Sequence, residues 1–238
     1  MIISHKYHFI FIKTGKTAGT SIEVYLSNIC SKKDIVTPIW PNLNQHKPRN
    51  YKNIFSPVSE IIKYNNFSKD IPDVFIRNSL VDMVKRRKFY NHIPSYLIKE
   101  RISRKIWNSY FKFCFERNPW DKVVSFYHMW KDRNDNQLCF DDYLLTGPFP
   151  HDLDKYTDPK NPSNIIVDYV AKYESLSEEL SIIFNKLGIP FKGKLNIFAK
   201  TEHRKQRKPY QEFYNNITRK IVEKEFSREI DMFGYTFE

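Results

Sequence analysis

The fold of this chain depends on the stretch Lys13-Thr14-Gly15-Lys16-Thr17-Ala18-Gly19-Thr20-Ser21, which follows the apolar run at residues 7–12. Apolar residues then recur at helical spacing at positions 22, 25, 26 and 29, so one face of a helix can pack on a sheet. In a strand, turn and helix of this kind, backbone N–H groups and the positive end of the helix converge on an anion. The stretch therefore predicts a phosphate-binding loop with Lys16 as a mobile cation and with contacts from Gly15, Lys16, Thr17, Ala18, Gly19, Thr20 and Ser21.

Two other interpretations of this loop stay open. The ATP-binding P-loop needs a glycine five residues before Gly15, where this chain has Ile10, so Gly15-Lys16-Thr17 matches only the second half of that motif. Otherwise the loop is a simple corner between a strand and a helix, in which the glycines permit a tight bend. Its position after an apolar run, and a second motif further along the chain, favour the anion site.

A second junction between a strand and a helix lies at residues 113–127. Asn118 is a good helix N-cap and Pro119 suits the first helical position, so we expect the helix to begin here. Arg117 ends the apolar strand, and Ser125 lies two turns into the helix. A guanidinium and a hydroxyl in these places can hold a second phosphate together. The alternative is that Arg117 forms an ordinary surface ion pair.

The two motifs resemble those of the sulfotransferases that use 3′-phosphoadenosine 5′-phosphosulfate (PAPS), in particular the carbohydrate sulfotransferase branch. Residues 11–21 are similar to the 5′-phosphosulfate loop of that family, with Gly15 where the family has proline, and residues 113–127 resemble its 3′-phosphate motif. Further similarity lies in Asn91-His92-Ile93-Pro94, where Asn91 replaces a glycine, in residues 167–176 and in residues 210–237. The resemblance spans nearly the whole chain, but residues 202–205 lack the Asn-x-Ser that the family often has before its last helix.

The resemblance implies a PAPS-dependent sulfotransferase that moves a sulfuryl group in line to an acceptor hydroxyl, with no metal required. The donor PAPS would be bound by residues 15–21 together with Arg117, Ser125 and Arg207. Lys16 would stabilise the leaving phosphate oxygen. His92 is the candidate base, because a neutral imidazole can accept a proton near pH 7. The carboxylates that could replace it are those of Glu60, Asp73 and Glu100.

Three apolar strands separated by helices predict the fold class. We expect them near residues 7–13, 110–116 and 165–170, which indicates an α/β fold: a three-layer, P-loop-like domain with a central, mainly parallel sheet flanked by helices. The 238 residues suffice for a single domain, residues 1–238, and the 41% of hydrophobic residues can fill its core. A capping box at residues 175–178 predicts a further helix that ends before Gly188. Loops are expected at residues 37–57, near the acceptor cleft, and at residues 132–136 and 146–164.

The formal net charge of +12 favours polyanionic ligands. It suits a nucleotide, an acidic glycan or nucleic acid, and the basic clusters at residues 85–88, 99–105 and 204–208 favour a glycan or another anionic acceptor. Three cysteines without a Cys-x-x-Cys pair predict neither disulfides nor a zinc site. No apolar stretch approaches the ~20 residues of a membrane span and no signal-peptide pattern is present, so we expect a cytoplasmic protein.

Two other functions stay open at this point. A P-loop kinase of small molecules would need Mg²⁺ and an aspartate at the end of a second strand, and no apolar strand here ends in an obvious aspartate of that kind. A nucleic-acid-binding protein would use the basic clusters, with tyrosine and phenylalanine rings as stacking surfaces. Its binding would depend steeply on salt and would not need PAPS. We expect no nucleic-acid partner.

Overall fold

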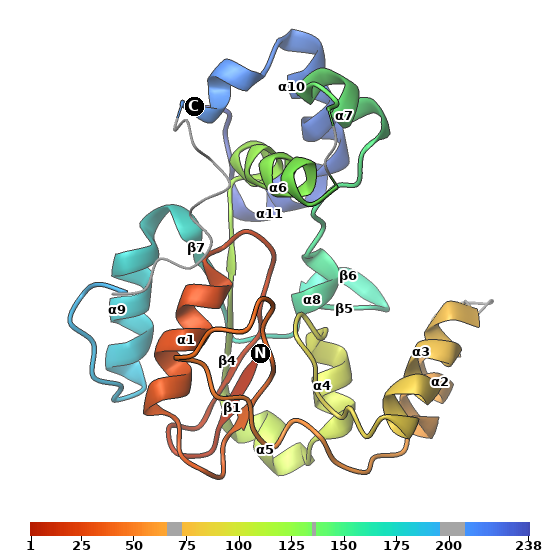
Figure 1. Ribbon diagram of the computed structural model, residues 1–238, viewed down its shortest axis with the longest axis vertical. Coiled ribbons are helices and arrows are strands. Elements are labelled where there is room, and N and C mark those ends of the chain that lie inside the picture. The colour runs from red at the N-terminus through yellow and green to blue at the C-terminus, as the bar shows by residue number, and fades with distance from the viewer. Residues whose placement is uncertain (66–72, 135–136, 196–207) are drawn as a thin grey trace.

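Short strands are interspersed with runs of helices along the chain (Figure 1). The structure is a computed structural model that describes residues 1–65, 73–134, 137–195 and 208–238. The strands are β1 (Ile2–Ser4), β2 (Phe9–Phe11), β3 (Ile35–Val36), β4 (Phe111–Glu116), β5 (Thr157–Asp158), β6 (Asn161–Ile165) and β7 (Tyr169–Lys172). The helices are α1 (Gly19–Ile29), α2 (Val58–Asn65), α3 (Asp73–Val84), α4 (Ser95–Arg101), α5 (Arg104–Ser109), α6 (Pro119–Asn134), α7 (Phe140–Thr146), α8 (Leu153–Tyr156), α9 (Leu176–Lys186), α10 (Asn216–Glu225) and α11 (Ser227–Phe233), with the 3-10 helices η1 (Tyr173–Ser175) and η2 (Tyr210–Phe213). Within the described ranges, no helix is both long enough and apolar enough to cross a membrane.

The main sheet is mixed, with the strand order β3-β1-β2-β4-β7. β4 is parallel to both β2 and β7, whereas β1 is antiparallel to both β2 and β3. Residues 5–8 between β1 and β2 are too few for a crossover connection, so β2 returns beside β1 as a hairpin. The predicted three-layer, P-loop-like domain around a mainly parallel sheet is therefore wrong, although the three predicted strands are present as β2, β4 and β7.

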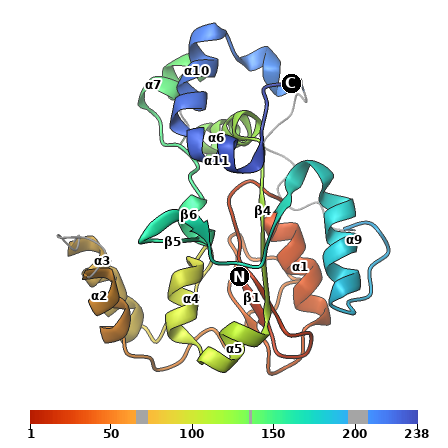
Figure 2. The same ribbon diagram turned by 180° about the vertical axis from the view of Figure 1, so that it is seen from behind.

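The side chains of the strands alternate between two apolar clusters. Ile10, Ile12 and Cys114 point to one cluster, where they pack with residues of α4, α5 and α8. Phe11 and Phe113, each one position away, point to the other cluster and pack with residues of α1 and α9. This period of two is that of a sheet with both faces buried. Figure 2 shows the two groups of helices on either side of the strands.

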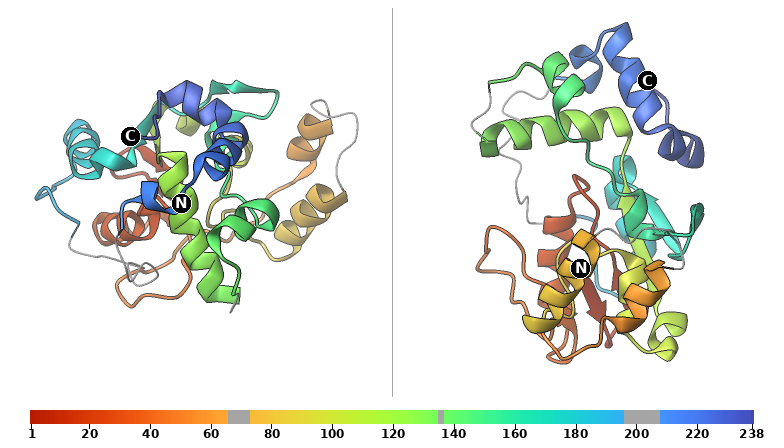
Figure 3. Two further views of the ribbon diagram at one scale, coloured as in Figure 1. Left: turned by 90° about the horizontal axis from the view of Figure 1, so that it is seen from above. Right: turned by 90° about the vertical axis from the view of Figure 1, so that its right-hand side faces the viewer.

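A third apolar cluster lies among α6, α7, α10 and α11, beyond the C-terminal end of β4 (Figure 3). Among the described residues no strand contributes to this cluster, so this group of helices does not form a layer on a face of the sheet. That is the second reason why the predicted three-layer arrangement is wrong. The buried residues of the cluster are largely aromatic and include Trp120, Tyr127, Phe140, Tyr143 and Phe226.

The local predictions have mixed outcomes. Asn118 caps α6 as predicted, because its Oδ1 accepts the backbone N–H groups of Trp120 and Asp121 at 3.1 and 3.4 Å. The predicted capping box is wrong, because Ser175 makes no side-chain capping hydrogen bond and η1 precedes α9. Residues 37–57 form no helix or strand, as expected. In contrast, residues 146–164 contain α8 and the β5–β6 hairpin, and α6 continues to residue 134; residues 135 and 136 lie outside the described residues.

The helices α2 and α3, which stand at one side of the molecule in Figure 1, turn acidic residues inward. Glu60 accepts hydrogen bonds from Arg101 Nε and Nη2 at 2.8 and 2.7 Å, and Asp82 Oδ2 lies 3.6 Å from Nη1 of the same arginine. All three side chains are buried. Val58 and Val84, in contrast, are 57% and 78% exposed. Buried charge pairing therefore helps to join α2 and α3 to α4.

Candidate functional site

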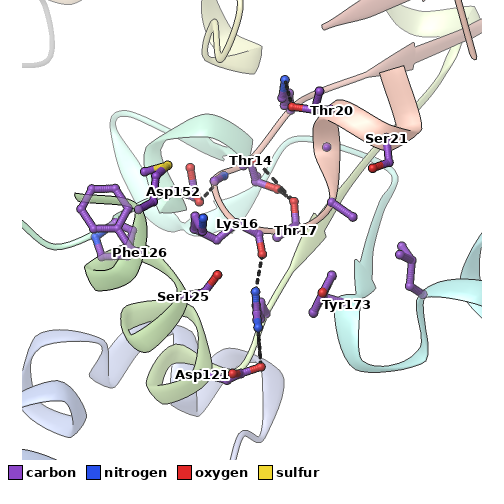
Figure 4. A pocket seen from close by; sticks show the side chains of 18 of the residues that line it. Thr14, Lys16, Thr17, Thr20, Ser21, Asp121, Ser125, Phe126, Asp152 and Tyr173 are labelled. Carbon is purple, nitrogen blue, oxygen red and sulfur yellow. Dashed lines mark hydrogen bonds and ion pairs between the residues drawn. The ribbon is translucent and has the colours of Figure 1, made fainter. Parts of the chain in front are cut away.

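A cleft of about 1160 Å³ opens where β2 and β4 end (Figure 4). These two strands are parallel neighbours, and ligands commonly bind beside the C-terminal ends of such strands. Arg207, which was also predicted to bind the donor, lies outside the described residues. The cleft brings together the other predicted site residues: Gly15, Lys16, Thr17, Ala18, Gly19, Thr20, Ser21, His92, Arg117 and Ser125.

The loop between β2 and α1 is braced by hydroxyl groups. Thr14 Oγ1 donates to the carbonyl oxygen of Phe115 at 2.5 Å and pairs with Thr17 Oγ1 at 2.9 Å. Lys16 and Ala18 have φ angles of 61° and 55°, in the left-handed region that residues other than glycine rarely adopt. A left-handed residue next to one of ordinary φ is the backbone conformation in which successive N–H groups form an anion-binding concavity, so the loop around Thr17 suits an anion.

The start of α1 presents backbone N–H groups that have no acceptor inside the helix. The first intrahelical hydrogen bond runs from the N–H of Ile22 to the carbonyl oxygen of Ala18 at 3.1 Å, so those of Gly19 and Thr20 have no intrahelical acceptor. Ala18 is the N-cap and has no polar side chain, and the first turn holds no acidic residue. This end of the helix therefore suits an anion.

A buried ion pair lies directly behind the loop. Lys13 Nζ contacts Glu23 Oε2 at 2.6 Å and Thr20 Oγ1 at 3.1 Å. A Cβ atom at Gly19 would lie 2.8 Å from Lys13 Cγ, so this close approach requires glycine. Lys13 therefore fixes the shape of the loop through its contacts with α1.

Arg117, which was predicted to hold a second phosphate, lies at the wall of the cleft. Its Nε and Nη2 donate to Asp121 Oδ2 at 3.0 and 2.6 Å, and its Nη1 donates to the carbonyl oxygen of Lys16 at 2.8 Å. Its guanidinium also lies 4.3 Å from the ring centre of Tyr173. Arg117 is only 7% exposed, which differs from the exposed surface pair of the alternative interpretation. A guanidinium has five N–H donors, so these three bonds leave two for an anion that also meets Ser125.

His92, the candidate base, is oriented by a backbone contact. Its Nδ1 lies 3.1 Å from the carbonyl oxygen of Lys13. A carbonyl oxygen only accepts hydrogen bonds, so Nδ1 carries the proton and Nε2 of the neutral ring keeps a lone pair. Burial, and after it the positive charge of Lys13, lowers the pKa of His92 to about 4. The ring is therefore neutral at pH 7.

Two of the carboxylates named as alternative bases lie elsewhere. Glu60 is paired with Arg101 and Glu100 with Lys63, and neither of them lines the cleft. Asp73 begins α3, and its side chain is not among those that the structure describes. Residues 37–57, the loop predicted to lie near the acceptor cleft, are not among the described residues that line this cleft. Apolar and basic side chains also line the cleft, namely Phe126, Met129, Arg133, Phe149, Lys155, Lys194 and Lys208.

Asp152 is a residue of the cleft that the sequence did not reveal. Its Oδ2 accepts the N–H of Gly15 at 2.7 Å and lies 2.8 Å from Lys122 Nζ. Lys122 Nζ also lies 2.7 Å from Glu116 Oε1, and the Tyr156 hydroxyl donates to Glu116 Oε2 at 2.8 Å. We call Glu116, Lys122 and Asp152 the buried triad. Burial opposes the charge of Lys122, but the attraction of the two carboxylates outweighs it and raises the pKa of Lys122.

Comparison with known proteins identifies a relative of this chain but no activity for it. No family model matches the chain. Over 119 residues, the chain is 36% identical to an uncharacterized protein from Archaeoglobus fulgidus, and the match covers 48% of this chain and 98% of the archaeal protein. The chain belongs to the family of this archaeal protein. Membership of the archaeal family names no substrate or reaction, so the function is argued from the geometry of the cleft.

Proposed function

We propose that the protein transfers the sulfuryl group of PAPS to a hydroxyl group of an acceptor. The observation that carries this proposal is the contact between the two anion motifs: Arg117 Nη1 donates to the carbonyl oxygen of Lys16, and both residues line one cleft. A nucleotide with phosphate groups on both its 3′ and 5′ positions presents two anions on a single ribose. Two neighbouring anion sites in one cleft fit such a nucleotide better than a nucleotide with a single phosphate chain.

The residues present fit this nucleotide. The N–H groups at the start of α1 and the left-handed loop around Thr17 would hold the 5′-phosphosulfate. The free donors of Arg117 and the hydroxyl of Ser125 would hold the 3′-phosphate. PAPS supplies an activated sulfuryl group with a phosphate as its leaving group. Lys16 would stabilise the negative charge that grows on that phosphate.

His92 would accept the proton of the acceptor hydroxyl at Nε2. Its pKa of about 4 keeps the ring neutral and ready to accept, but lies below the range that serves a general base best at neutral pH. An anion bound in the neighbouring loop would favour the protonated imidazolium and so raise this pKa. The nucleotide would thereby make His92 a stronger base in the complex than in the free protein.

Basic side chains of the cleft support an anionic acceptor, most readily a glycan with acidic groups. Arg133, Lys155, Lys194 and Lys208 line the cleft. Among the described acidic residues that line it, Asp121 pairs with Arg117 and Asp152 with Lys122, while Lys155 pairs with Asp154. Such a cleft attracts a negatively charged chain. We also propose a cytoplasmic location. Supporting it, the three cysteines are free, and free thiols suit a reducing compartment.

Calorimetric titration with adenosine 3′,5′-bisphosphate, with and without Mg²⁺ and with ATP as a competitor, tests the proposal. We expect binding that does not depend on Mg²⁺ and that ATP does not displace at equal concentration. If ATP binds more tightly and needs Mg²⁺, the protein is a kinase rather than a sulfotransferase. If only nucleic acid binds, with an affinity that falls steeply as salt rises, the protein belongs to the nucleic-acid-binding class.

A further inference from the structure

The buried triad has no part in the chemistry above, yet it contacts both anion motifs. We propose that Asp152 is a positioning residue, which fixes the anion-binding loop at Gly15 relative to the second anion motif at Arg117. The assignment of each motif to one phosphate group of a nucleotide rests on the proposed function. The positioning itself rests on the contacts of Asp152.

On the side of the loop, Asp152 binds the backbone. Its Oδ2 accepts the N–H of Gly15 at 2.7 Å, and a Cβ atom at residue 15 would come within 3.2 Å of the same oxygen. Asp152 precedes α8 and is its N-cap, but its carboxylate makes no capping hydrogen bond to that helix. The carboxylate therefore serves the loop rather than the helix that follows it.

On the other side, the triad reaches the second motif. Lys122 Nζ lies 2.8 Å from Asp152 Oδ2 and 2.7 Å from Glu116 Oε1, and the same Glu116 oxygen accepts the N–H of Arg117 at 2.9 Å. Hydrogen bonds and ion pairs thus run without a break from Gly15 to Arg117. Together with the bond from Arg117 Nη1 to the carbonyl oxygen of Lys16, they hold the loop at two successive residues.

Asp152 acts through the loop and not on the ligand. A carboxylate repels a phosphate group, and the Oδ2 atom already contacts both Lys122 and the N–H of Gly15. Both contacts of Asp152 use Oδ2, so the side-chain oxygen of an asparagine could still accept from Gly15 and Lys122. The variant that removes the anchor is therefore Asp152→Ala, which leaves Lys122 paired with Glu116.

The first arm of the test needs no ligand. Hydrogen–deuterium exchange of the free protein should become at least about 5-fold faster in a peptide covering residues 13–21 on Asp152→Ala, because an anchoring contact of this segment is lost. The matched control is Asp34→Ala. Asp34 is also a buried carboxylate that accepts backbone N–H groups, from His5 and Ser31 at 2.8 Å each, and it does not line the cleft. Equal exchange of residues 13–21 in the wild type and Asp152→Ala overturns the proposal.

The second arm uses adenosine 5′-phosphate, adenosine 3′-phosphate and adenosine 3′,5′-bisphosphate as probes in calorimetry. Asp152→Ala should weaken the binding of the two ligands with a 5′-phosphate by about 10-fold, the usual scale for one lost hydrogen bond to a charged group. It should change the affinity for adenosine 3′-phosphate by less than about 2-fold, and Asp34→Ala should change the affinity for all three ligands by no more than that. An equal loss for all three ligands indicates general damage and overturns the positioning role. If the wild type binds none of them, the proposed function fails, while the exchange arm still decides whether Asp152 anchors the loop.

Discussion

The side chain of His92 is neutral in the cleft because burial and the charge of Lys13 disfavour its protonated form. In the unfolded chain the same side chain has its ordinary pKa of 6.5, against about 4 in the folded protein. Between these two values the unfolded state binds a proton that the folded state does not. His92 therefore costs the protein stability as the pH falls from 6.5 toward 4.

Replacing His92 with asparagine should remove this acid dependence. Asparagine tolerates the left-handed backbone that His92 adopts at a φ of 58°. Relative to the variant, the wild type should lose about 2 kcal/mol of unfolding free energy between pH 7 and pH 5, from the linkage of the two pKa values. Urea unfolding at the two pH values measures the difference. Parallel pH profiles for the two proteins would show that the ring is not buried as described.

Among the elements, α2 and α3 depend on buried charge. Arg101 on α4 is the shared partner of Glu60 on α2 and Asp82 on α3. Asp82 has a second partner in Arg87 at 2.5 Å, whereas Glu60 has only Arg101 among the described ion pairs. Removing the arginine therefore leaves Glu60 as a buried carboxylate without compensation, and that is expensive.

Arg101→Met should lower the unfolding free energy by about 3–5 kcal/mol, the usual cost of breaking a buried pair from one side. The double variant Glu60→Met with Arg101→Met should recover much of this loss, because no unpaired charge remains in place of the pair. Urea unfolding of the single and double variants measures both values. A double variant as unstable as Arg101→Met alone would mean that packing of the arginine, and not charge, joins these helices.

The strand-loop-helix junctions were predictable because their signals are local. The run before Lys13 and the Asn118-Pro119 pair each identify one junction within a few residues. The mixed sheet was not predictable in this way, because β1 has three residues and pairs through the turn at residues 5–8, which carries no glycine or Asn-Gly signal. Pro159 and Pro162 make the sequence of the β5–β6 hairpin indicate a loop. The structure has strands there because an isolated pair of edge strands tolerates proline.

The candidate site also has a part that local sequence signals predict and a part that they do not. Residues 15–21, Arg117 and Ser125 follow from motifs with short spacing, and the structure brings them to one cleft. Asp152 lies 137 residues from Gly15 in the sequence, in a stretch whose proline content indicates a loop. No periodic pattern distinguishes such a carboxylate from an exposed one. Contacts between distant segments carry this part of the site, and only the folded chain shows them.

At the scale of the whole molecule, the second anion motif is held by the last residues described. Asn118 Nδ2 donates to the carbonyl oxygen of Thr236 at 2.8 Å. The Phe237 ring contacts the rings of Trp120 and Tyr214, with centres 5.5 Å away in each case. The start of α6, and with it the position of Arg117, therefore depends on the far end of the chain.

Phe237→Ala should lower the unfolding free energy by about 2 kcal/mol, less than the cost at a fully buried phenylalanine because this ring is half-buried. It should also weaken the binding of adenosine 3′-phosphate more than the binding of adenosine 5′-phosphate, because the Phe237 ring contacts Trp120, which lies beside the second anion motif. Ile217→Ala on α10, at a side chain that is 74% exposed, is the control and should change stability by less than about 0.5 kcal/mol. If the two substitutions change stability and nucleotide binding equally, the C-terminal segment does not position the second anion motif.

The buried triad restricts how this cleft can evolve. One lysine pairs with two carboxylates, so a lineage that loses Lys122 should also lose the charge at position 116 or 152, because two unpaired acids would otherwise repel each other in the interior. The residue at position 15 is coupled to position 152 as well, because a proline at position 15 has no N–H to donate to Asp152. Homologues with proline at 15 are therefore expected to be free to vary position 152, and homologues with glycine at 15 to keep an acid there. Substitutions at positions 15, 116, 122 and 152 should therefore covary among homologues.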